Sequence, residues 1–378
     1  MNVAILDKTI NSLKLTEKCQ LFGTRDNDKV VVSSLKMRKG FEQVGVFYQS
    51  KEDYDGDANN SFLLFSINNE RLVCSYVNDD GTSENVELNI INYSTDFGNR
   101  IQGVVDPSVL QETTITIIGA GSGGAVTAED LVRSGVGNLN LVDFDTVSAS
   151  NICRSIYDLT DIGEKKTEAL YKKLIRINPY ENINIYDEDV LEMDIKTLRQ
   201  IIKISDIVIE ATDNIKSKKY ISGLTINTTI ALYPAVYDKG KGGDILFTVP
   251  GVTPCFECVF KSIYEEMKDV KRSEWEYSSD GTKPVSMSGL ISDIKVVASR
   301  SVKLALAFLT GDQDNSFLEK VTESGCTMLF IGNESGFSIF DKPFQEVWAE
   351  TEINPECFCQ TLGRSVCESP KETVSLSE

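Results

Sequence analysis

The chain has 378 residues, 41% of them hydrophobic and 25% charged, so it is long enough to bury one large core or two smaller ones, and we expect two domains. Its formal net charge of −19 argues against a nucleic-acid surface, which needs a basic stripe. The sequence has no run of about 18 apolar residues and no basic-then-apolar start, so we expect a soluble cytoplasmic protein that binds no membrane, with its nine cysteines as reduced thiols or metal ligands.

Histidine is absent from the sequence. Its absence excludes a Ser-His-Asp triad, a histidine-based zinc hydrolase and any histidine general base. The chemistry of this chain must therefore depend on charge, on positioning and on metal ions.

The first 95 residues are predicted to form a β-rich module. Tight turns at Asn68-Asn69 and at Asp79-Asp80-Gly81 separate strand-like runs, and the acidic stretch from Lys51 to Ser61 is predicted to be a loop. The predicted strands are Val30–Ser33, Val44–Tyr48, Phe62–Ile67, Leu72–Val77 and Val86–Ile91. We interpret this module as a docking or scaffold domain.

A strand-turn-helix-strand pattern follows, and the rest of the chain is organised around it. The strand Ile115–Ile118 leads into Gly119, Gly121 and Gly124, which match the G-x-G-x-x-G pattern of a phosphate-binding turn. Such a turn places backbone amides and the positive end of a helix against an anion. A glycine cluster that only turns the chain is the alternative, and its position between a β-branched strand and an amphipathic helix argues against it.

The second strand of this pattern, Leu139–Val142, ends at an acidic residue. Asp143 follows the third glycine at the interval expected of an acid that binds a ribose, so turn and acid together indicate an adenine nucleotide. Arg154 comes soon afterwards. An arginine at that place favours ATP over NAD, because phosphates need such a partner and hydride transfer does not.

Further along, the run from Asp206 to Glu210 is predicted to be a buried parallel strand, after a helix from Glu164 to Arg176. Asp213 lies just beyond the carboxyl end of that strand, where open α/β sheets bind ligands. We interpret Asp213 as a magnesium ligand; the alternative is an aspartate that caps the next helix.

Two close pairs of cysteines, Cys255 with Cys258 and Cys357 with Cys359, lie about a hundred residues apart. Four thiolates suit tetrahedral Zn²⁺. The second pair is C-x-C, so the fourth ligand stays open, with Cys367 as a replacement, and unligated buried thiols are the alternative.

Between the two pairs the sequence contains no cysteine from Val259 to Gly325. Residues 261–284 are polar, and apolar residues recur at helical spacing from Met287 to Leu309. After Gly363 the chain is rich in serine and glutamate, and we expect it to be disordered.

Several motifs, in this order along the chain, resemble the ThiF/MoeB superfamily, which includes ubiquitin-activating enzymes. They are Gly119-Ala120-Gly121-Ser122-Gly123-Gly124, Gly135-Val136-Gly137, Val142-Asp143-Phe144-Asp145, Ser150-Asn151, Arg154, Asp161-Ile162-Gly163 with Lys166, and Ala211-Thr212-Asp213-Asn214. The resemblance covers roughly residues 95 to 360. It implies ATP-dependent adenylylation of a carboxylate, usually the C-terminal glycine of a ubiquitin-like protein, with release of pyrophosphate.

The resemblance also implies roles for individual residues. Asn151, Arg154 and Lys166 would disperse phosphate charge, although Lys165 beside Lys166 leaves the register open by one residue. Asp213 would hold Mg²⁺, and the cysteines would hold a structural Zn²⁺. The nucleotide-binding set is Gly119, Gly121, Gly124, Asp143, Asp145 and Arg100. Arg100 matches an arginine that reaches a phosphate from the partner subunit of a homodimer; a solvated linker arginine is the alternative.

Within the superfamily, three features look most like bacterial members encoded beside ubiquitin-like, conjugating and JAB-type peptidase proteins, which suggests antiviral defence. They are Asn99-Arg100-Ile101-Gln102-Gly103, the Gly121-Ser122-Gly123-Gly124 turn and Asn354-Pro355-Glu356-Cys357. We expect a doubly wound, mostly parallel α/β sheet with a Rossmann-like nucleotide site at 96–360, a β-rich module at 1–95 that resembles a degenerate JAB domain, and a tail at 361–378.

Thioester-forming relatives carry a cysteine in the stretch that lacks one here, so we expect direct transfer of the adenylate. The alternatives are a peptide-modifying enzyme, like the microcin maturation enzyme, and a catalytically silent nucleotide-binding scaffold.

Overall fold

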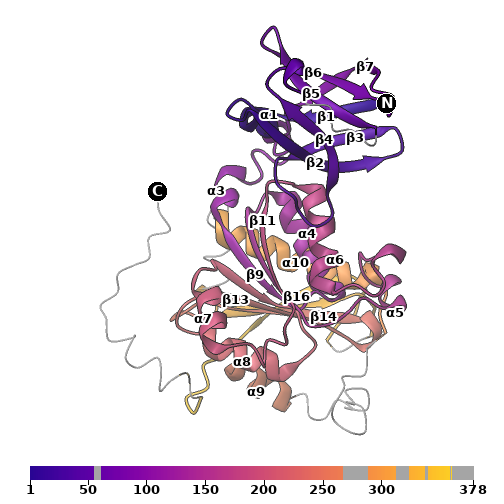
Figure 1. The fold of residues 1–378 in the computed structure, drawn as a ribbon. Helices are drawn as coiled ribbons and strands as arrows, with labels where there is room; N and C mark the ends of the chain where they lie inside the picture. The colour runs from indigo at the N-terminus through magenta and orange to yellow at the C-terminus, as the bar shows by residue number, and fades with distance from the viewer. Residues whose placement is uncertain (55–60, 267–287, 312–322, 337–338, 358, 360–378) are drawn as a thin grey trace. The chain divides into compact units, whose positions relative to one another are not determined.

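The computed structural model describes residues 1–54, 61–266, 288–311, 323–336, 339–357 and 359 (Figure 1). Its described residues fall into two compact units. The first consists of Met1–Val104 with Lys172–Tyr180, and the second of Val105–Tyr171 with the described residues from Glu181 onward. The predicted tail at 361–378 lies outside the described residues.

The first unit is built on a mixed β-sheet, with the order β7-β6-β5-β4-β2-β3-β1-β8. The pairs β1–β3, β1–β8 and β4–β5 are parallel, and the others are antiparallel. Alternating apolar residues such as Val3 and Ile5, together with Phe47 and Phe65, form its core. The elements are β1 (Asn2–Leu6), α1 (Asp7–Leu13), β2 (Lys18–Asp26), β3 (Lys29–Ser34), β4 (Glu42–Tyr48), β5 (Phe62–Asn68), β6 (Arg71–Val77), β7 (Ser83–Val86), β8 (Leu88–Ile91) and α2 (Tyr93–Asp96).

The predicted strands of this unit are present, with one error and two omissions. The prediction of a single strand over Val86–Ile91 was wrong, because the chain breaks at Glu87 into β7 and β8, which pair with β6 and β1 at opposite ends of the sheet. The strands β1 and β2 were not predicted. Of the predicted loop at 51–61, residues 51–53 form a short 3₁₀ helix and residues 55–60 lie outside the description.

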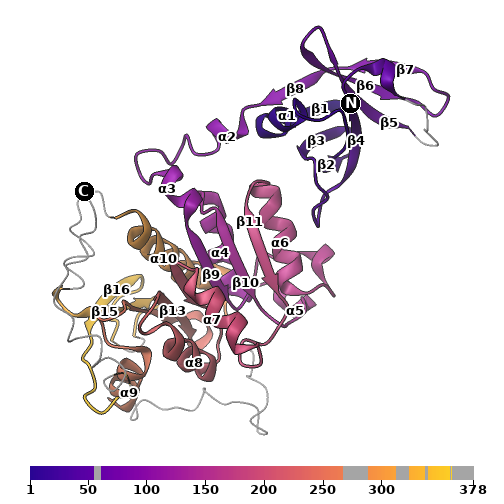
Figure 2. The ribbon, with the colours of Figure 1, turned by 60° about the vertical axis from the view of Figure 1, so that its left-hand side comes forward.

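The second unit is an α/β unit around a sheet with the order β11-β10-β9-β12-β13-β14-β15-β16 (Figures 1 and 2). The strands from β11 to β13 are parallel, and those from β14 onward are antiparallel to their neighbours. The elements are α3 (Pro107–Glu112), β9 (Thr114–Ile118), α4 (Ser122–Ser134), β10 (Asn138–Val142), α5 (Ala149–Ile152), α6 (Lys166–Ile177), β11 (Asn182–Tyr186), α7 (Ile195–Lys203), β12 (Ile207–Glu210), α8 (Ile215–Thr225), β13 (Ile230–Tyr237), β14 (Gly242–Thr248), α9 (Phe256–Glu266), α10 (Ile291–Thr310), β15 (Cys326–Gly332) and β16 (Gln345–Glu350).

Helices cover both faces of this sheet. On one face, residues of α7, α8 and α9 pack with Val208 of β12 and Tyr233 of β13 in one buried cluster. On the other face lie α4 and α10, which contact each other, with α10 also against β13 and β14 (Figure 2). The parallel strands have the order of a doubly wound sheet. The chain adds β10 and β11 on one side of β9, then returns to add β12 and β13 on the other side, so the strand order reverses between β9 and β12. The predicted fold class is therefore confirmed. None of the described helices combines the length and the apolar character that a membrane span needs.

Candidate nucleotide and metal sites

The glycine turn after β9 has the geometry of a phosphate-binding turn. Gly119 has φ +93°, a conformation that disfavours a side chain, and its N–H donates to the Val142 carbonyl at 2.8 Å. A Cβ at Gly124 would lie 1.8 Å from the Gly119 oxygen, so helix and turn can approach this closely only with glycine. A Cβ at Gly121 would meet no atom of the described residues within 4 Å. Space is therefore open at Gly121, at the first turn of α4.

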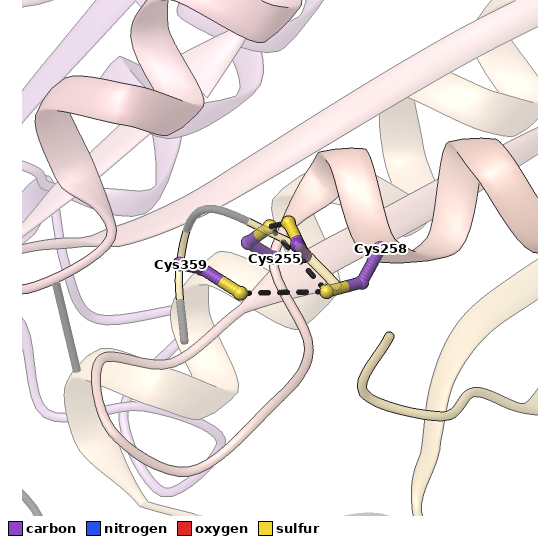
Figure 3. A group of neighbouring side chains, drawn as sticks. Cys255, Cys258 and Cys359 are labelled. Carbon is purple, nitrogen blue, oxygen red and sulfur yellow. Dashed lines mark hydrogen bonds between the residues drawn. The ribbon is translucent and has the colours of Figure 1, made fainter. Parts of the chain in front are cut away.

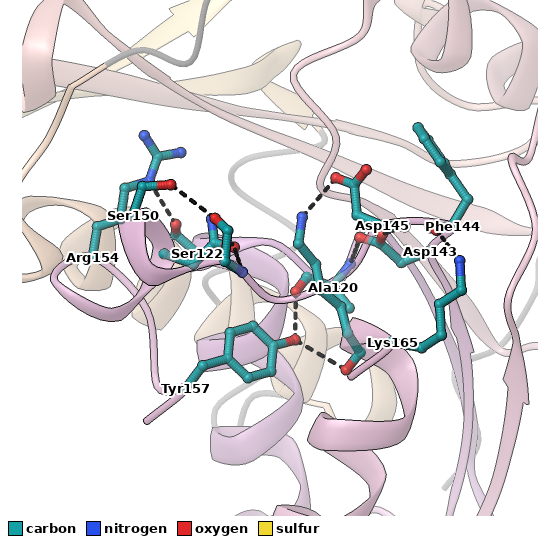
Figure 4. A network of polar contacts seen from close by, with 12 residues as sticks. Ala120, Ser122, Asp143, Phe144, Asp145, Ser150, Arg154, Tyr157 and Lys165 are labelled. Atoms are coloured by element: carbon teal, nitrogen blue, oxygen red, sulfur yellow. Dashed lines mark hydrogen bonds and ion pairs between the residues drawn. The ribbon is translucent and has the colours of Figure 1, made fainter. Parts of the chain in front are cut away.

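The carboxylate of Asp143, at the end of β10, braces this turn. One oxygen accepts from the Ala120 N–H and the other from the Asp145 N–H, both at 2.7 Å (Figure 4). The side chain is largely buried. Burial raises the pKa of Asp143 above its usual value, and Lys166 and the Asp145 amide act in the opposite direction.

Lys166 faces this acidic pair. Its Nζ lies 2.7 Å from Asp145 Oδ2, and Asp145 keeps half of its side chain exposed. Lys165 points its ammonium elsewhere, donating to the Phe144 carbonyl at 2.6 Å. Of the two lysines that the sequence left open, Lys166 is thus the one paired with the acid of the nucleotide motif.

Tyr157, which was not identified from the sequence, also contacts the glycine turn. Its buried hydroxyl contacts the carbonyl oxygens of Ala120 at 2.7 Å and Lys166 at 3.2 Å (Figure 4). Burial, with Asp143 and Asp161 nearby, raises the pKa of Tyr157 well above its usual value. The hydroxyl therefore stays protonated and links the glycine turn to the start of α6.

Arg154 lies beside the first turn of α4, where its Nε donates to Ser122 Oγ at 2.9 Å (Figure 4). Its positive charge is thereby placed at the same helix end as Gly121. Asn151 uses its side-chain oxygen as a cap, accepting from the Ser148 N–H at 2.9 Å. This bond fixes the turn that precedes Arg154.

Asp213 is exposed and lies on the loop just after β12, the strand that pairs with β9. The neighbouring residue Thr212 contacts the glycine turn, since a Cβ at Gly119 would lie 3.0 Å from Thr212 Cγ2. The loop that carries Asp213 and the glycine turn therefore lie side by side, between β9 and β12, where the winding of the sheet reverses. Asn214 caps α8, accepting from the Lys216 N–H at 2.9 Å, so the alternative capping role falls to Asn214 and not to Asp213.

The structure thus brings most of the predicted nucleotide-site residues to the carboxyl ends of β9, β10 and β12. They are Gly119, Gly121, Gly124, Asp143, Asp145, Asn151, Arg154, Lys166 and Asp213. Arg100 is an exposed residue of the first unit, and its phosphate role stays a prediction.

The predicted cysteines also come together. The sulfur atoms of Cys255, Cys258, Cys357 and Cys359 all lie within 4.8 Å of one another. Cys255 is 3.7 Å from Cys258 and 3.6 Å from Cys357, and Cys258 is 3.4 Å from Cys359 (Figure 3). Ligands bound at about 2.3 Å in a tetrahedron have sulfur atoms about 3.8 Å apart, so this group fits Zn²⁺. Cys367, the predicted replacement, lies outside the described residues.

The thiols of this cluster influence each other's ionisation. The hydrogen bond from Cys255 lowers the pKa of Cys258, and the same contact raises the pKa of Cys255. A thiolate is the form that binds zinc. Among the other described cysteines, Cys153 is exposed after α5, and Cys326 begins β15.

Sequence reasoning missed a buried network below Asp213. Glu210, with no exposed surface, contacts the hydroxyls of Thr212 and Ser217 and lies 3.5 Å from Lys218 Nζ. The sequence contained a signal for this network, because an acidic residue at the end of an otherwise apolar, buried strand needs hydrogen-bond or ion-pair partners. The sequence pattern of α8 does not indicate that Lys218 is the partner of Glu210.

Comparisons with known proteins agree with this geometry. A family model described as "ThiF family" matches residues 94–328. The molybdopterin-synthase adenylyltransferase of Escherichia coli is 31% identical over 151 residues, covering 40% of this chain and 59% of that protein. The ubiquitin-like modifier-activating enzyme 5 of Caenorhabditis elegans is 31% identical over 159 residues, covering 40% of this chain and 38% of that protein. The chain thus matches less than two thirds of either relative.

Solved structures show the same fold at lower identity. The crystal structure of E. coli MccB with selenomethionine MccA superposes with a TM-score of 0.50 and 17% identity, covering 66% of this chain and 67% of that one. The glycine turn, the acids after β10 and the residues after β12 all fall inside the stretch that the family model matches. This chain belongs to the ThiF family.

Proposed function

We propose that this chain is an ATP-dependent adenylyltransferase that activates the C-terminal carboxylate of a small protein or peptide. The observation that carries the proposal is the meeting of the glycine turn, Arg154 and Asp213 at the point where the sheet changes its direction of winding. Open α/β sheets bind nucleotides at this place.

The residues at this place are suited to binding a nucleoside triphosphate. The open space at Gly121, above the first turn of α4, admits a phosphate to the backbone amides there, and Arg154 adds a cation beside it. Asp143, the predicted ribose ligand, also holds the turn in shape, and the exposed carboxylate of Asp145 beside it is accessible to ribose hydroxyls as well. Lys166 then lies where it can leave Asp145 and pair with phosphate.

The residues also fit a divalent cation. Asp213 offers an exposed carboxylate next to the phosphate turn, and Mg²⁺ is usually held by one or two carboxylates together with substrate phosphates. Bound there, the ion would neutralise charge that develops on the departing pyrophosphate. The chain itself supplies the position of that carboxylate.

In the proposed reaction, a carboxylate oxygen of the substrate attacks the α-phosphorus of ATP. The bond between the α-phosphorus and the bridging oxygen breaks, and pyrophosphate leaves with the bonding electrons. Arg154, Lys166 and the amides of the turn stabilise the charge on the phosphates through electrostatic interactions that are already oriented. No proton acceptor is needed for a carboxylate nucleophile, which suits a chain without histidine.

For the substrate we propose a ubiquitin-like protein in a bacterial conjugation pathway, with a conjugating enzyme as a further partner and with antiviral defence as the setting. The names of the matched relatives, which include ubiquitin-like modifier-activating enzymes, support the ubiquitin-like substrate. A homodimer, in which Arg100 reaches the partner's nucleotide, belongs to the same proposal. So does a structural Zn²⁺ in the cysteine cluster.

A peptide substrate is the second candidate. It is favoured by the lack of any cysteine from Val259 to Gly325, since a peptide-modifying enzyme needs no thioester. A silent nucleotide-binding scaffold is the third, and it requires that the site bind ATP without chemistry.

ATP–pyrophosphate exchange in the presence of a candidate substrate tests the proposal. We expect exchange with the wild type and an acyl-adenylate on the substrate's C-terminus by mass spectrometry. We expect neither with Asp213→Ala, at unchanged thermal stability. Nucleotide binding without exchange, across ubiquitin-like proteins and precursor peptides encoded nearby, would support the scaffold instead.

A further inference from the structure

We propose that Glu210 positions Asp213 through the hydroxyl of Thr212, so that these two residues set the affinity of the site for its divalent cation. This inference rests on the proposed function, which makes Asp213 a metal ligand. Neither Glu210 nor Thr212 touches the reacting atoms in this proposal, and both act as positioning residues.

The first step of the argument is the burial of Glu210. Its side chain is fully inaccessible at the carboxyl end of β12, yet it carries a carboxylate. A buried carboxylate costs several kcal/mol unless it is hydrogen-bonded or paired, so a fold retains one only where its contacts compensate. Glu210 has such contacts on the loop that follows it.

The second step is how this carboxylate holds the loop. Glu210 Oε1 accepts from the hydroxyl of Thr212 and, at 2.7 Å, from the hydroxyl of Ser217 in α8. Thr212 Oγ1 in turn accepts from the Asn214 N–H at 3.2 Å. The residues on both sides of Asp213 are therefore held by one chain of hydrogen bonds that begins at Glu210.

The third step is the anchor of Glu210 itself. Lys218 is buried, lies 3.5 Å from Glu210 Oε2, and donates to the carbonyls of Glu210 at 3.3 Å and Pro234 at 2.6 Å. It therefore compensates the carboxylate and ties the end of β12 to the middle of β13. Asn214 caps α8 at the far side of the loop, so Asp213 extends from a backbone fixed at both ends.

The fourth step links this loop to the phosphate turn. The methyl group of Thr212 lies against Gly119, where a Cβ would be 3.0 Å away. The hydroxyl of Thr212 thus belongs to the Glu210 network, and its methyl group belongs to the nucleotide turn. Substitutions that remove one group and keep the other can separate the two contacts.

The test uses Thr212→Val, which keeps the methyl contact and loses the hydroxyl, and Thr212→Ser, which keeps the hydroxyl. Glu210→Asp retains the charge opposite Lys218 and shortens the arm that reaches Thr212. Thr229→Val is the matched control, because Thr229 is a buried threonine whose hydroxyl donates to the Ile202 carbonyl, away from the loop.

Each full-length variant is titrated with Mn²⁺ in the presence of α,β-methylene-ATP, and free Mn²⁺ is followed by electron paramagnetic resonance. Loss of partners behind a metal ligand commonly weakens metal affinity by about 10- to 100-fold. We expect Thr212→Val and Glu210→Asp each to weaken Mn²⁺ binding by about tenfold. Because both substitutions break the same chain of hydrogen bonds, the double variant should bind Mn²⁺ no more weakly than the single variant with the lower Mn²⁺ affinity. Thr229→Val should bind Mn²⁺ as the wild type does, and Thr212→Ser, which keeps the hydroxyl, should bind Mn²⁺ more tightly than Thr212→Val.

The same proteins are assayed for Mg²⁺ dependence of ATP–pyrophosphate exchange and for melting temperature. If the wild type exchanges pyrophosphate and binds Mn²⁺, while folded Thr212→Val has unchanged Mn²⁺ affinity, the positioning role is overturned and the proposed function stands. Equal weakening in Thr229→Val would also overturn it, since general destabilisation would then be the cause. A wild type with neither exchange nor Mn²⁺ binding would overturn both.

Discussion

The Nζ of Lys166 lies 2.7 Å from Asp145 Oδ2, with the lysine nearly buried and the aspartate half exposed. Asp145 thus holds Lys166 beside the proposed nucleotide site, whereas the adjacent Lys165 donates to the Phe144 carbonyl.

This arrangement predicts different effects for neighbouring substitutions. Lys166→Gln removes the cation that can pair with phosphate, and we expect kcat/KM for ATP in pyrophosphate exchange to fall about a hundredfold. Lys165→Gln is the matched control and should lower it by less than about threefold, in the range of an exposed charge contact. Equal losses in both variants would show that the pairing seen here does not select the phosphate-binding lysine.

Arg154 places its charge at the first turn of α4 through its bond to Ser122. We expect Arg154→Ala to lower pyrophosphate exchange by about a hundredfold or more, since it removes a cation directed at phosphate charge. Arg133→Ala serves as the control, because Arg133 is an exposed arginine of the same helix paired with Glu129 at 2.7 Å. A folded Arg154→Ala protein with near-normal exchange would contradict the proposed mechanism.

The cysteine cluster predicts about one equivalent of zinc per chain, because its sulfur atoms already have near-tetrahedral spacing. Elemental analysis of Cys255→Ser should show loss of most of the zinc, and a chelator should lower the melting temperature of the wild type. Cys19→Ser, at a half-buried cysteine of β2, should retain the metal. Carefully prepared wild type with less than half an equivalent would refute the zinc assignment.

Asp244 is buried in β14, and one of its carboxylate oxygens has no hydrogen-bond partner among the described residues, which predicts a pH-dependent stability. Burial raises its pKa from 3.8 to about 7, although Lys218 acts in the opposite direction. Between these two values the native state keeps a proton that the unfolded state has lost, so the free energy of unfolding falls as pH rises from about 4 to about 7.

Asp244→Asn removes this ionisation and imitates the protonated acid. Its stability relative to wild type should rise with pH over that range, by at most about 4 kcal/mol, since one pKa unit corresponds to about 1.4 kcal/mol. Urea denaturation of both proteins between about pH 4.5 and 8 measures the difference, with Asp341→Asn at an exposed position as the control. A difference that does not change with pH would mean that Asp244 is ionised throughout.

The lack of cysteine from Val259 to Gly325 predicts that the adenylate passes directly to the nucleophile of a partner. Cys153 is exposed and precedes Arg154, but its thiol contacts the Ser150 carbonyl within the turn that holds the arginine. Enzyme incubated with ATP and substrate should give no thiol-sensitive adduct on non-reducing gels. Such an adduct, lost in one Cys→Ala variant, would name a nucleophile and exclude direct transfer.

The fold class, and the edge of the sheet at which we propose the nucleotide site, could both be predicted from the sequence. A β-branched strand, a glycine turn and an amphipathic helix are local features, each specified by residues within a few positions of one another. Because the carboxyl ends of parallel strands lie along one edge, residues placed after three strands could be assigned to one site without any knowledge of their contacts. Asp143, Arg154 and Asp213 were predicted on that basis.

Which side chains pair could not be predicted from the sequence and depends on the tertiary packing. Cys258 and Cys359 are separated by about a hundred residues in the sequence, and their 3.4 Å contact depends on how two segments return to one place. The choice of Lys166 over Lys165 depends on the rotation of α6 at its first residue. Glu210 meets Lys218 because β12 and α8 pack against each other. Such pairings are set by the packing of whole elements, which the identity of neighbouring residues along the chain does not specify.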